Sequence, residues 1–279
     1  MSTRAELFAR FDLSGRVAVI TGGAGLLGPR HANAIASAGG IPVLVDLHRD
    51  RAESQAAELE RTHGVPAIGL GVDITSPSAV EAMLADVLAR HGRVDILVNN
   101  AANNPKVEDA ANVAFSRLEN FPLRQWEADV AVGLTGAFLC SQIVGRELAR
   151  RGRGSIVNIS SEYGMIAPDQ RLYRQEGLPE EQQPVKPVTY SVVKAGLMGL
   201  TSYLATYWAT RGVRCNTLTV GGVFNGQPES FVARAASRIP MERMANPDEY
   251  EGAIVFLCSD ASSFMTGANL VVDGGKTCW

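Results

Sequence analysis

The chain has 279 residues, of which 46% are hydrophobic and 20% charged, and its formal net charge is −3. This size and apolar content predict a single globular domain over residues 1–279 with a large core. Because acids and bases are interspersed and no basic stripe occurs, we expect no nucleic-acid partner. The sequence contains no signal-peptide core, no apolar run of transmembrane length and no CxxC pair. We therefore expect a cytoplasmic protein with no membrane partner, no disulfide framework and no metal site.

Short apolar, β-branched segments alternate with segments of helical periodicity along the whole chain. The predicted strands are 16–21, 41–46, 66–74, 94–101, 155–160, 214–220 and 269–274. The clearest predicted helices are 50–63, 76–91, 124–151, 189–211 and 247–259. Strands that are apolar along their whole length are typical of a parallel sheet covered by helices on both faces. The pattern predicts a doubly wound Rossmann-type α/β domain with a seven-stranded parallel sheet, residues 16–160 forming the cofactor-binding half and 161–279 the catalytic and substrate half.

Two polar, irregular segments interrupt this alternation, at 103–123 and 167–187. Each follows a predicted strand, and ligands bind at the carboxyl edge of an open parallel sheet. We expect the inserted loop 167–187 to lie over or beside the site, where its Arg, Lys and Gln side chains would suit a hydroxyl-rich or anionic substrate. A solvated surface excursion or an oligomer contact is the alternative.

The first predicted strand runs directly into a glycine-rich loop, TGGAGLLG at 21–28, in which Gly23, Gly25 and Gly28 give G-x-G-x-x-G. A helical segment follows, which is the context that gives this pattern weight. Glycines let the backbone approach a pyrophosphate, and the helix N-terminus offers free N–H groups and a positive dipole end. We predict a dinucleotide phosphate site with contacts from Gly22, Gly25, Leu27 and Gly28.

Two acidic residues stand at the ends of the next two predicted strands. Asp46 can accept hydrogen bonds from both hydroxyls of an adenosine ribose and would repel a 2′-phosphate, which favours NAD over NADP as the cofactor. The nearby Arg49 works against that preference. Asp73, beside Ile74, would accept a hydrogen bond from the adenine amine or cap the helix that starts near Ser76.

Five further motifs follow in a fixed order: NNAA (99–102), SIVNISS (155–161), TYSVVK (189–194), RCNTLTVGG (214–222) and FLCSDASSFMTGANLVVDGG (256–275). With the glycine loop, they resemble the short-chain dehydrogenase/reductase family, in a classical-like form, from Gly15 to Gly275. The resemblance implies an NAD(P)-dependent oxidoreductase acting on CH–OH groups. It implies a catalytic set of Ser161, Tyr190 and Lys194. It also implies cofactor contacts from Ile74, Asn100, Ala101, Ala102, Tyr190, Lys194, Gly221 and Val223.

The residue types of the catalytic set fit this chemistry. A free tyrosine has a pKa of about 10, too high for a good base at neutral pH. Lys194 lies four positions after Tyr190, on the same helix face, and its ammonium should favour the phenolate and lower the pKa of Tyr190. Ser161 would hold the substrate oxygen, and Tyr190 would take the hydroxyl proton during oxidation or return it during reduction.

The chain departs from the family pattern at several points. Leu26 replaces the middle glycine of the loop, which gives the spacing of the extended subgroup, and Val220 replaces a proline. Gly133 stands where the family usually has an asparagine that holds a water on the proton path. We expect a slower or altered proton relay, and tight helix packing is the alternative reason for a glycine.

The substrate class is less sharply indicated. SSEYGMIAPD (160–169) and GGVFNGQPESF (221–231) resemble, more loosely, dehydrogenases of bacterial flagellin modification and nonulosonic-acid synthesis. This implies that the substrate is a sugar, sugar phosphate or nucleotide sugar, and a polyol is the next most favoured class. The alternatives are a 3-oxoacyl-thioester reductase and, because of Gly133, a non-catalytic nucleotide-binding scaffold or sensor. The helix at 189–211 is apolar on several sides, and the family resemblance implies a homodimer or homotetramer.

Overall fold

The computed structural model describes residues 2–103 and 116–279. Its centre is one sheet of seven parallel strands in the order β3-β2-β1-β4-β5-β6-β7. The strands are β1 Val17–Thr21, β2 Ile41–Asp46, β3 Ile68–Gly71, β4 Ile96–Asn99, β5 Gly154–Ser161, β6 Val213–Val220 and β7 Asn269–Val272. The predicted parallel sheet is confirmed; β3 and β4 are shorter than predicted at both ends, and β7 ends two residues earlier than predicted.

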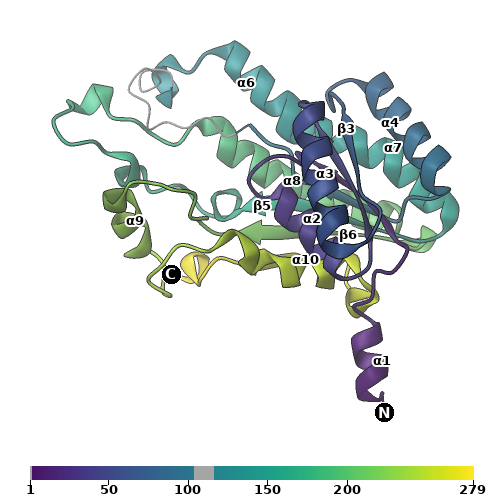
Figure 1. Ribbon diagram of the computed structural model, residues 1–279. Coiled ribbons are helices and arrows are strands. Elements are labelled where there is room, and N and C mark those ends of the chain that lie inside the picture. Colours follow the sequence, from purple (N-terminus) through teal and green to yellow (C-terminus); the bar gives the residue numbers. More distant parts are fainter. Residues whose placement is uncertain (1, 104–115) are drawn as a thin grey trace.

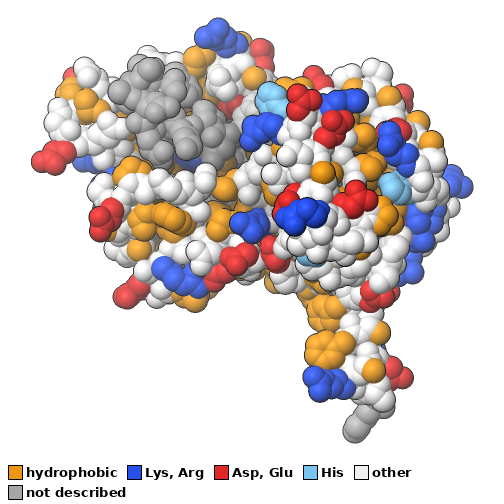
Figure 2. All heavy atoms as spheres, viewed as in Figure 1, with side chains coloured by type: hydrophobic (Ala, Val, Ile, Leu, Met, Phe, Trp, Pro, Cys, Tyr) orange, Lys and Arg blue, Asp and Glu red, His pale blue; other side chains and the backbone are white. Residues whose placement is uncertain are grey.

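Helices cover both faces of the sheet (Figure 1). One face carries α2 Gly28–Ser37, α3 Arg49–His63 and α10 Glu251–Cys258. The other carries α4 Pro77–His91, α7 Gly136–Arg151 and α8 Val188–Tyr207. The remaining helices are α1 Arg4–Ala9, α6 Leu123–Val130 and α9 Glu229–Ala236. Helix α1 projects away from the domain (Figure 1), and hydrophobic side chains lie on its surface (Figure 2). Leu7 and Phe8 are among the exposed ones.

The burial of the strands explains why they are apolar at successive positions. All residues of β1 and β4 are buried, as are seven of the eight residues of β5. Side chains alternate between the two faces of a strand, so both faces must be covered. The β1 residues Ala18 and Ile20 belong to the core under α2 and α10, whereas Val17 and Val19 belong to the core under α4 and α7. This double core fixes the sheet whose carboxyl edge carries the site.

Among the described residues, one helical run has the length and hydropathy of a membrane span, Leu123–Arg151. It is built from α6, a short π-helix at Ala131–Thr135 and α7. Helix α7 buries eleven residues and packs against α4 and β5, and it ends at Gly152, which takes a left-handed φ of 72°. Its apolar character therefore reflects its place in the core of the domain.

Gly133 lies inside the π-helix and is buried against α8. A Cβ built on Gly133 would lie 2.5 Å from Cγ1 of Val193, closer than two carbon atoms can approach. The alternative reason given above for this glycine, tight helix packing, is therefore supported by the geometry. A π-helix at this point is also notable because such segments are frequent at functional sites.

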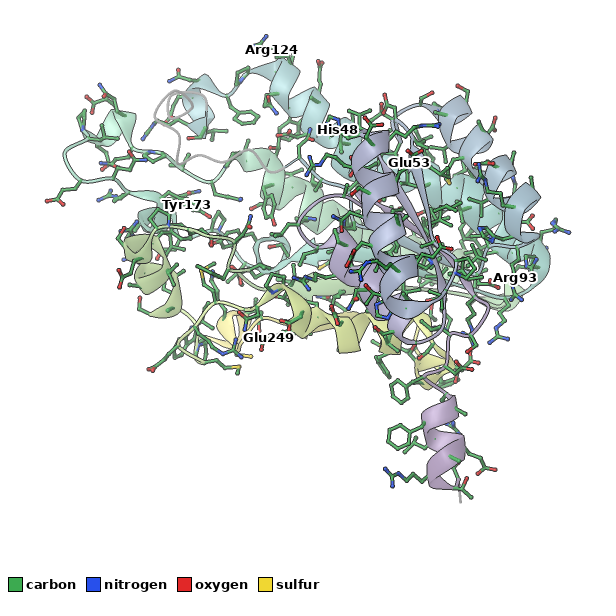
Figure 3. The ribbon with its side chains drawn as sticks, viewed as in Figure 1. His48, Glu53, Arg93, Arg124, Tyr173 and Glu249 are labelled. Carbon is green, nitrogen blue, oxygen red and sulfur yellow. The ribbon has the colours of Figure 1, made fainter. Side chains whose placement is uncertain are left out.

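Loop 167–187 is packed onto the domain through α9. It contains two 3-10 turns, Gln170–Tyr173 and Glu180–Gln182. Leu172 is 1% exposed and packs with Ala235 and Met244. Tyr173, labelled in Figure 3, lies near α9, and its ring centre is 5.9 Å from that of Phe231. The other irregular segment predicted above, 103–123, falls mostly outside the described residues.

The close contact at Gly133 predicts a stability effect. In Gly133→Ala, the added methyl overpacks the α8 contact, and this outweighs the gain from removing a helical glycine. We expect the free energy of unfolding to fall by about 1–2 kcal/mol, measured by urea denaturation at one protein concentration with an unchanged m-value.

Gly252 in α10 supplies the matched control, because a Cβ there would meet no atom within 4 Å. Gly252→Ala should be neutral or more stable by up to about 1 kcal/mol. Equal stability of Gly133→Ala and the parent chain would contradict the packing explanation.

Candidate active site

A cavity of about 620 Å³ opens at the carboxyl edge of the sheet. Every residue predicted to contact substrate or cofactor lines this cavity, with the exception of Gly28. The predicted catalytic and cofactor-binding residues therefore belong to one continuous site, although they come from segments between residues 22 and 223.

The glycine loop is held in a shape that side chains would prevent. Gly22 has a φ of +63°, and a Cβ on it would lie 2.9 Å from Cα of Ala101. A Cβ on Gly28 would lie 2.2 Å from the carbonyl oxygen of Gly22, so Gly28 closes the turn from behind rather than facing the cavity. Gly25 and Leu27 face the cavity at the start of α2. The loop thus presents bare backbone and a helix N-terminus to the cavity, which fits a pyrophosphate.

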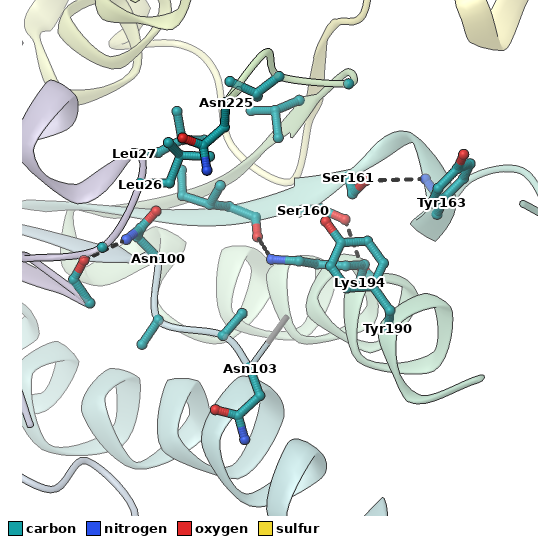
Figure 4. A pocket seen from close by; sticks show the side chains of 18 of the residues that line it. Leu26, Leu27, Asn100, Asn103, Ser160, Ser161, Tyr163, Tyr190, Lys194 and Asn225 are labelled. Atoms are coloured by element: carbon teal, nitrogen blue, oxygen red, sulfur yellow. Dashed lines mark hydrogen bonds between the residues drawn. The ribbon is translucent and has the colours of Figure 1, made fainter. Parts of the chain in front are cut away.

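Asn100 and Thr21 tie the NNAA segment to this loop. The side-chain amide of Asn100 donates hydrogen bonds to the carbonyl oxygens of Thr21 (3.0 Å) and Gly22 (3.1 Å). The hydroxyl of Thr21 accepts from the backbone N–H groups of Asn100 and Ala101, each at 3.1 Å. Asn100 therefore supports the glycine loop (Figure 4). Ala101 and Ala102 line the cavity wall.

The two acidic residues predicted for the adenosine end lie on the cavity wall. Asp46 Oδ2 accepts from the backbone N–H of Ala24 at 3.1 Å, and Oδ1 accepts from that of His48 at 3.1 Å. Each oxygen retains a lone pair for a ribose hydroxyl. Asp73 Oδ1 accepts from the N–H and hydroxyl of Thr75, which lowers the pKa of Asp73. Ser76, not Asp73, caps α4, so the capping alternative for Asp73 is wrong.

The predicted catalytic side chains come from β5 and the first two turns of α8 (Figure 4). Ser161 is the last residue of β5, and its hydroxyl accepts a hydrogen bond from the backbone N–H of Tyr163 at 3.3 Å. Lys194 is buried, and its ammonium donates to the carbonyl oxygen of Ile159 at 2.8 Å. The ammonium lies 5.8 Å from the ring centre of Tyr190.

The charge state of this group differs from the prediction. Burial raises the pKa of Tyr190, the negative charge of Glu162 adds to the rise, and the hydroxyl of Ser161 opposes it. Burial and the charge of Lys186 lower the pKa of Lys194 to about 8. The prediction that Lys194 lowers the pKa of Tyr190 below its usual value is therefore wrong for the protein by itself, because desolvation outweighs an ammonium that is engaged with Ile159.

Sequence reasoning missed a polar cluster in the substrate half of the cavity. Glu162 and Lys276 form an ion pair of 2.5 Å, and Lys276 also donates to the hydroxyl of Tyr163 at 3.3 Å. All three residues are at least 90% buried and line the cavity. The position of Glu162 next to Ser161 was a possible signal, whereas nothing in the sequence placed Lys276 beside it.

The polar residues of loop 167–187 contribute less to the cavity lining than predicted. Arg171 pairs with Asp169 and Arg174 with Glu180, and both arginines are exposed. From this loop Leu172, Tyr173 and Lys186 line the cavity, and the ammonium of Lys186 lies 3.9 Å from the ring centre of Tyr190. The prediction that the loop borders the site is confirmed, but its arginines lie outside the cavity lining.

Comparison with known protein families gives two matches that together span most of the chain. Residues 16–173 match the family described as short chain dehydrogenase. Residues 179–277 match the family described as Enoyl-(Acyl carrier protein) reductase.

Individual relatives match over nearly their whole length. The chain is 35% identical to a D-threitol dehydrogenase from Mycolicibacterium smegmatis, covering 99% of each chain. A gluconate 5-dehydrogenase from Burkholderia cenocepacia J2315, solved with NADP and tartrate, superimposes with a TM-score of 0.83 at 30% identity, covering 97% of this chain and 98% of that one. An NAD+-bound xylitol dehydrogenase superimposes with a TM-score of 0.82 at 26% identity, covering 94% and 99%.

These relatives are polyol and sugar-acid dehydrogenases, and the two solved structures contain NADP and NAD, respectively. Together with the family match, they set aside the non-catalytic scaffold alternative. The chain belongs to the short-chain dehydrogenase/reductase family and is a nicotinamide-dependent oxidoreductase that acts on CH–OH groups.

Proposed function

We propose that the chain is a cytoplasmic, NAD-dependent dehydrogenase that oxidises a secondary hydroxyl of a polyol or a related sugar, and that it catalyses the reverse reduction. The observation that carries the proposal is the meeting of Ser161, Tyr190 and Lys194 in one cavity with the glycine loop. The names of the relatives favour polyols over nucleotide sugars within the wider sugar class.

The side chains would divide the reaction between them. The hydroxyl of Ser161 holds the substrate oxygen, and Tyr190 accepts the proton of the substrate hydroxyl. Lys194 supports the negative charge that Tyr190 needs as a base, and it offers N–H groups to the ribose of the cofactor. The nicotinamide, when bound, accepts the hydride that leaves the carbon, so the alcohol becomes a ketone. In reduction the proton returns from the Tyr190 hydroxyl.

Asp46 supports the choice of NAD. Its carboxylate faces the cavity, and a 2′-phosphate beside it would bring two negative charges together. Arg49, which could have neutralised this repulsion, is largely exposed and forms a long ion pair of 3.8 Å with Glu53. Arg51 donates to the carbonyl oxygen of Ala24 at 3.3 Å.

We also propose that α7 and α8 pair with a second copy of the chain in a homodimer or homotetramer. Large apolar side chains on these helices are exposed: Phe138, Val192, Tyr203 and Tyr207. Tyr203 and Tyr207 stack with ring centres 5.6 Å apart, which makes a flat apolar surface. Light scattering coupled to size-exclusion chromatography should give twice or four times the 29.7 kDa chain mass, and a monomer at micromolar concentration would contradict this proposal.

The proposed function predicts a dependence on Tyr190. With NAD and a panel of polyols, the parent chain should reduce NAD measurably, and the rate should rise with pH as more Tyr190 becomes phenolate, because its pKa is raised. Tyr190→Phe should lower kcat by about 100- to 10,000-fold. NADH fluorescence titration should show that the variant still binds cofactor. A Tyr190→Phe variant with parental turnover would overturn the proposed role.

The cofactor preference predicts a selective effect at Asp46. Asp46→Asn keeps the shape but removes the charge, so the ratio of kcat/KM for NAD to that for NADP should fall by about tenfold or more. Asp73→Asn, on the same cavity wall, is the matched control and should leave this ratio within about threefold. Parental use of NADP in preference to NAD would show that the Asp46 argument is wrong.

A further inference from the structure

The Glu162–Lys276 pair is unusual among the ion pairs of the described residues. Its side chains are 4% and 9% exposed, whereas at least one partner of every other such pair is at least 16% exposed. Burying two charges costs more free energy than a well-packed apolar pair of the same size, so a buried ion pair is not explained by stability alone. Its place in the cavity lining suggests another reason.

The pair has unused hydrogen-bonding capacity. Oε1 of Glu162 binds Lys276, but Oε2 is buried and has no hydrogen-bond partner. Burial raises the pKa of Glu162, and the charge of Lys276 and the nearby backbone N–H of Gly222 oppose that rise. The ammonium of Lys276 has three donors, of which the contacts to Glu162 and Tyr163 use two. A ligand could therefore find one acceptor and one donor here.

The cluster lies beside the reacting group. Tyr163 packs edge-to-face against Tyr190, with ring centres 6.4 Å apart, and Glu162 directly follows Ser161 in the chain. Part of the surrounding wall is apolar, from Leu172, Phe231, Ile239 and Met244. A molecule held by Ser161 and Tyr190 would thus extend between a paired charge and an apolar surface.

We infer that Glu162 and Lys276 bind hydroxyl groups of the substrate other than the one that is oxidised, and so select polyols over simple alcohols and acyl chains. A hydroxyl both donates and accepts, which matches Oε2 of Glu162 together with an N–H of Lys276. An acyl chain would leave Oε2 of Glu162 and this N–H of Lys276 buried without hydrogen-bond partners, which costs free energy. The inference rests on the proposed function and argues against the 3-oxoacyl-thioester alternative.

The test uses three alcohols with the same four-carbon chain: butan-2-ol, butane-2,3-diol and threitol. For the parent chain with NAD, kcat/KM should rise along this series by about 100-fold or more in total. Each protein is assayed at its own pH optimum, because the charge of Glu162 also affects the pKa of Tyr190.

Two variants separate binding from folding. Glu162→Gln should lower the ratio of kcat/KM for threitol to kcat/KM for butan-2-ol by about tenfold. The double variant Glu162→Met, Lys276→Met removes both charges, so no unpaired charge stays buried and the protein should fold. Its kcat/KM for threitol should be about 100-fold lower than that of the parent chain, and it should still oxidise butan-2-ol.

Glu147→Gln is the matched control, because Glu147 is also a buried carboxylate, paired with Arg150 through two hydrogen bonds of 2.7 Å outside the cavity. Glu147→Gln should leave kcat/KM for all three alcohols unchanged. Parental activity of the double variant on threitol, or an equal loss on all three alcohols, would overturn the inference while leaving the proposed function intact. A parent chain that oxidises neither these alcohols nor any other polyol would overturn the proposed function and this inference together.

Discussion

The contact between α8 and the end of β5 is the interaction on which the site depends. Lys194 makes two hydrogen bonds across this contact. Its carbonyl oxygen accepts from the hydroxyl of Ser160 at 2.7 Å, and its ammonium donates to the carbonyl oxygen of Ile159 at 2.8 Å. Gly164 completes the contact, since a Cβ there would lie 2.8 Å from the carbonyl carbon of Lys194. Because helix and strand are locked in this register, Tyr190 and Ser161 are placed by the core of the domain rather than by surface loops.

The two sides of the cavity, proposed for the cofactor and for the substrate, are lined in two different ways. On the cofactor side, the glycine loop and the NNAA segment present backbone, and the side chains of Thr21 and Asn100 point back to support it. On the substrate side, side chains line the wall, and a carboxylate and an ammonium face each other without solvent. Backbone recognition suits a cofactor shared by many enzymes, whereas side chains can change from one family member to another and so determine the substrate.

The sequence was sufficient to predict the sheet because each strand is encoded by its own short apolar run. Short, β-branched apolar runs such as 41–46 are typical of buried strands, and the glycine loop follows directly from β1. The electrostatics of the site could not be predicted in this way. Glu162 and Lys276 are distant in sequence, and each looks like an ordinary surface residue until the fold brings them together. The prediction of a lowered pKa for Tyr190 was wrong for a related reason. The four-residue spacing reveals Lys194 but not the burial of Tyr190, which raises its pKa.

The contact between Gly133 and Val193 also restricts how the protein can evolve. The asparagine that the family resemblance implies at residue 133 would clash with Cγ1 of Val193, so the effects of substitutions at the two positions should depend on each other. A smaller residue at 193 would have to be fixed first, and in α8 that change opens a gap one residue before Lys194. A chain that acquired the asparagine in this order would therefore pass through a less well-packed intermediate.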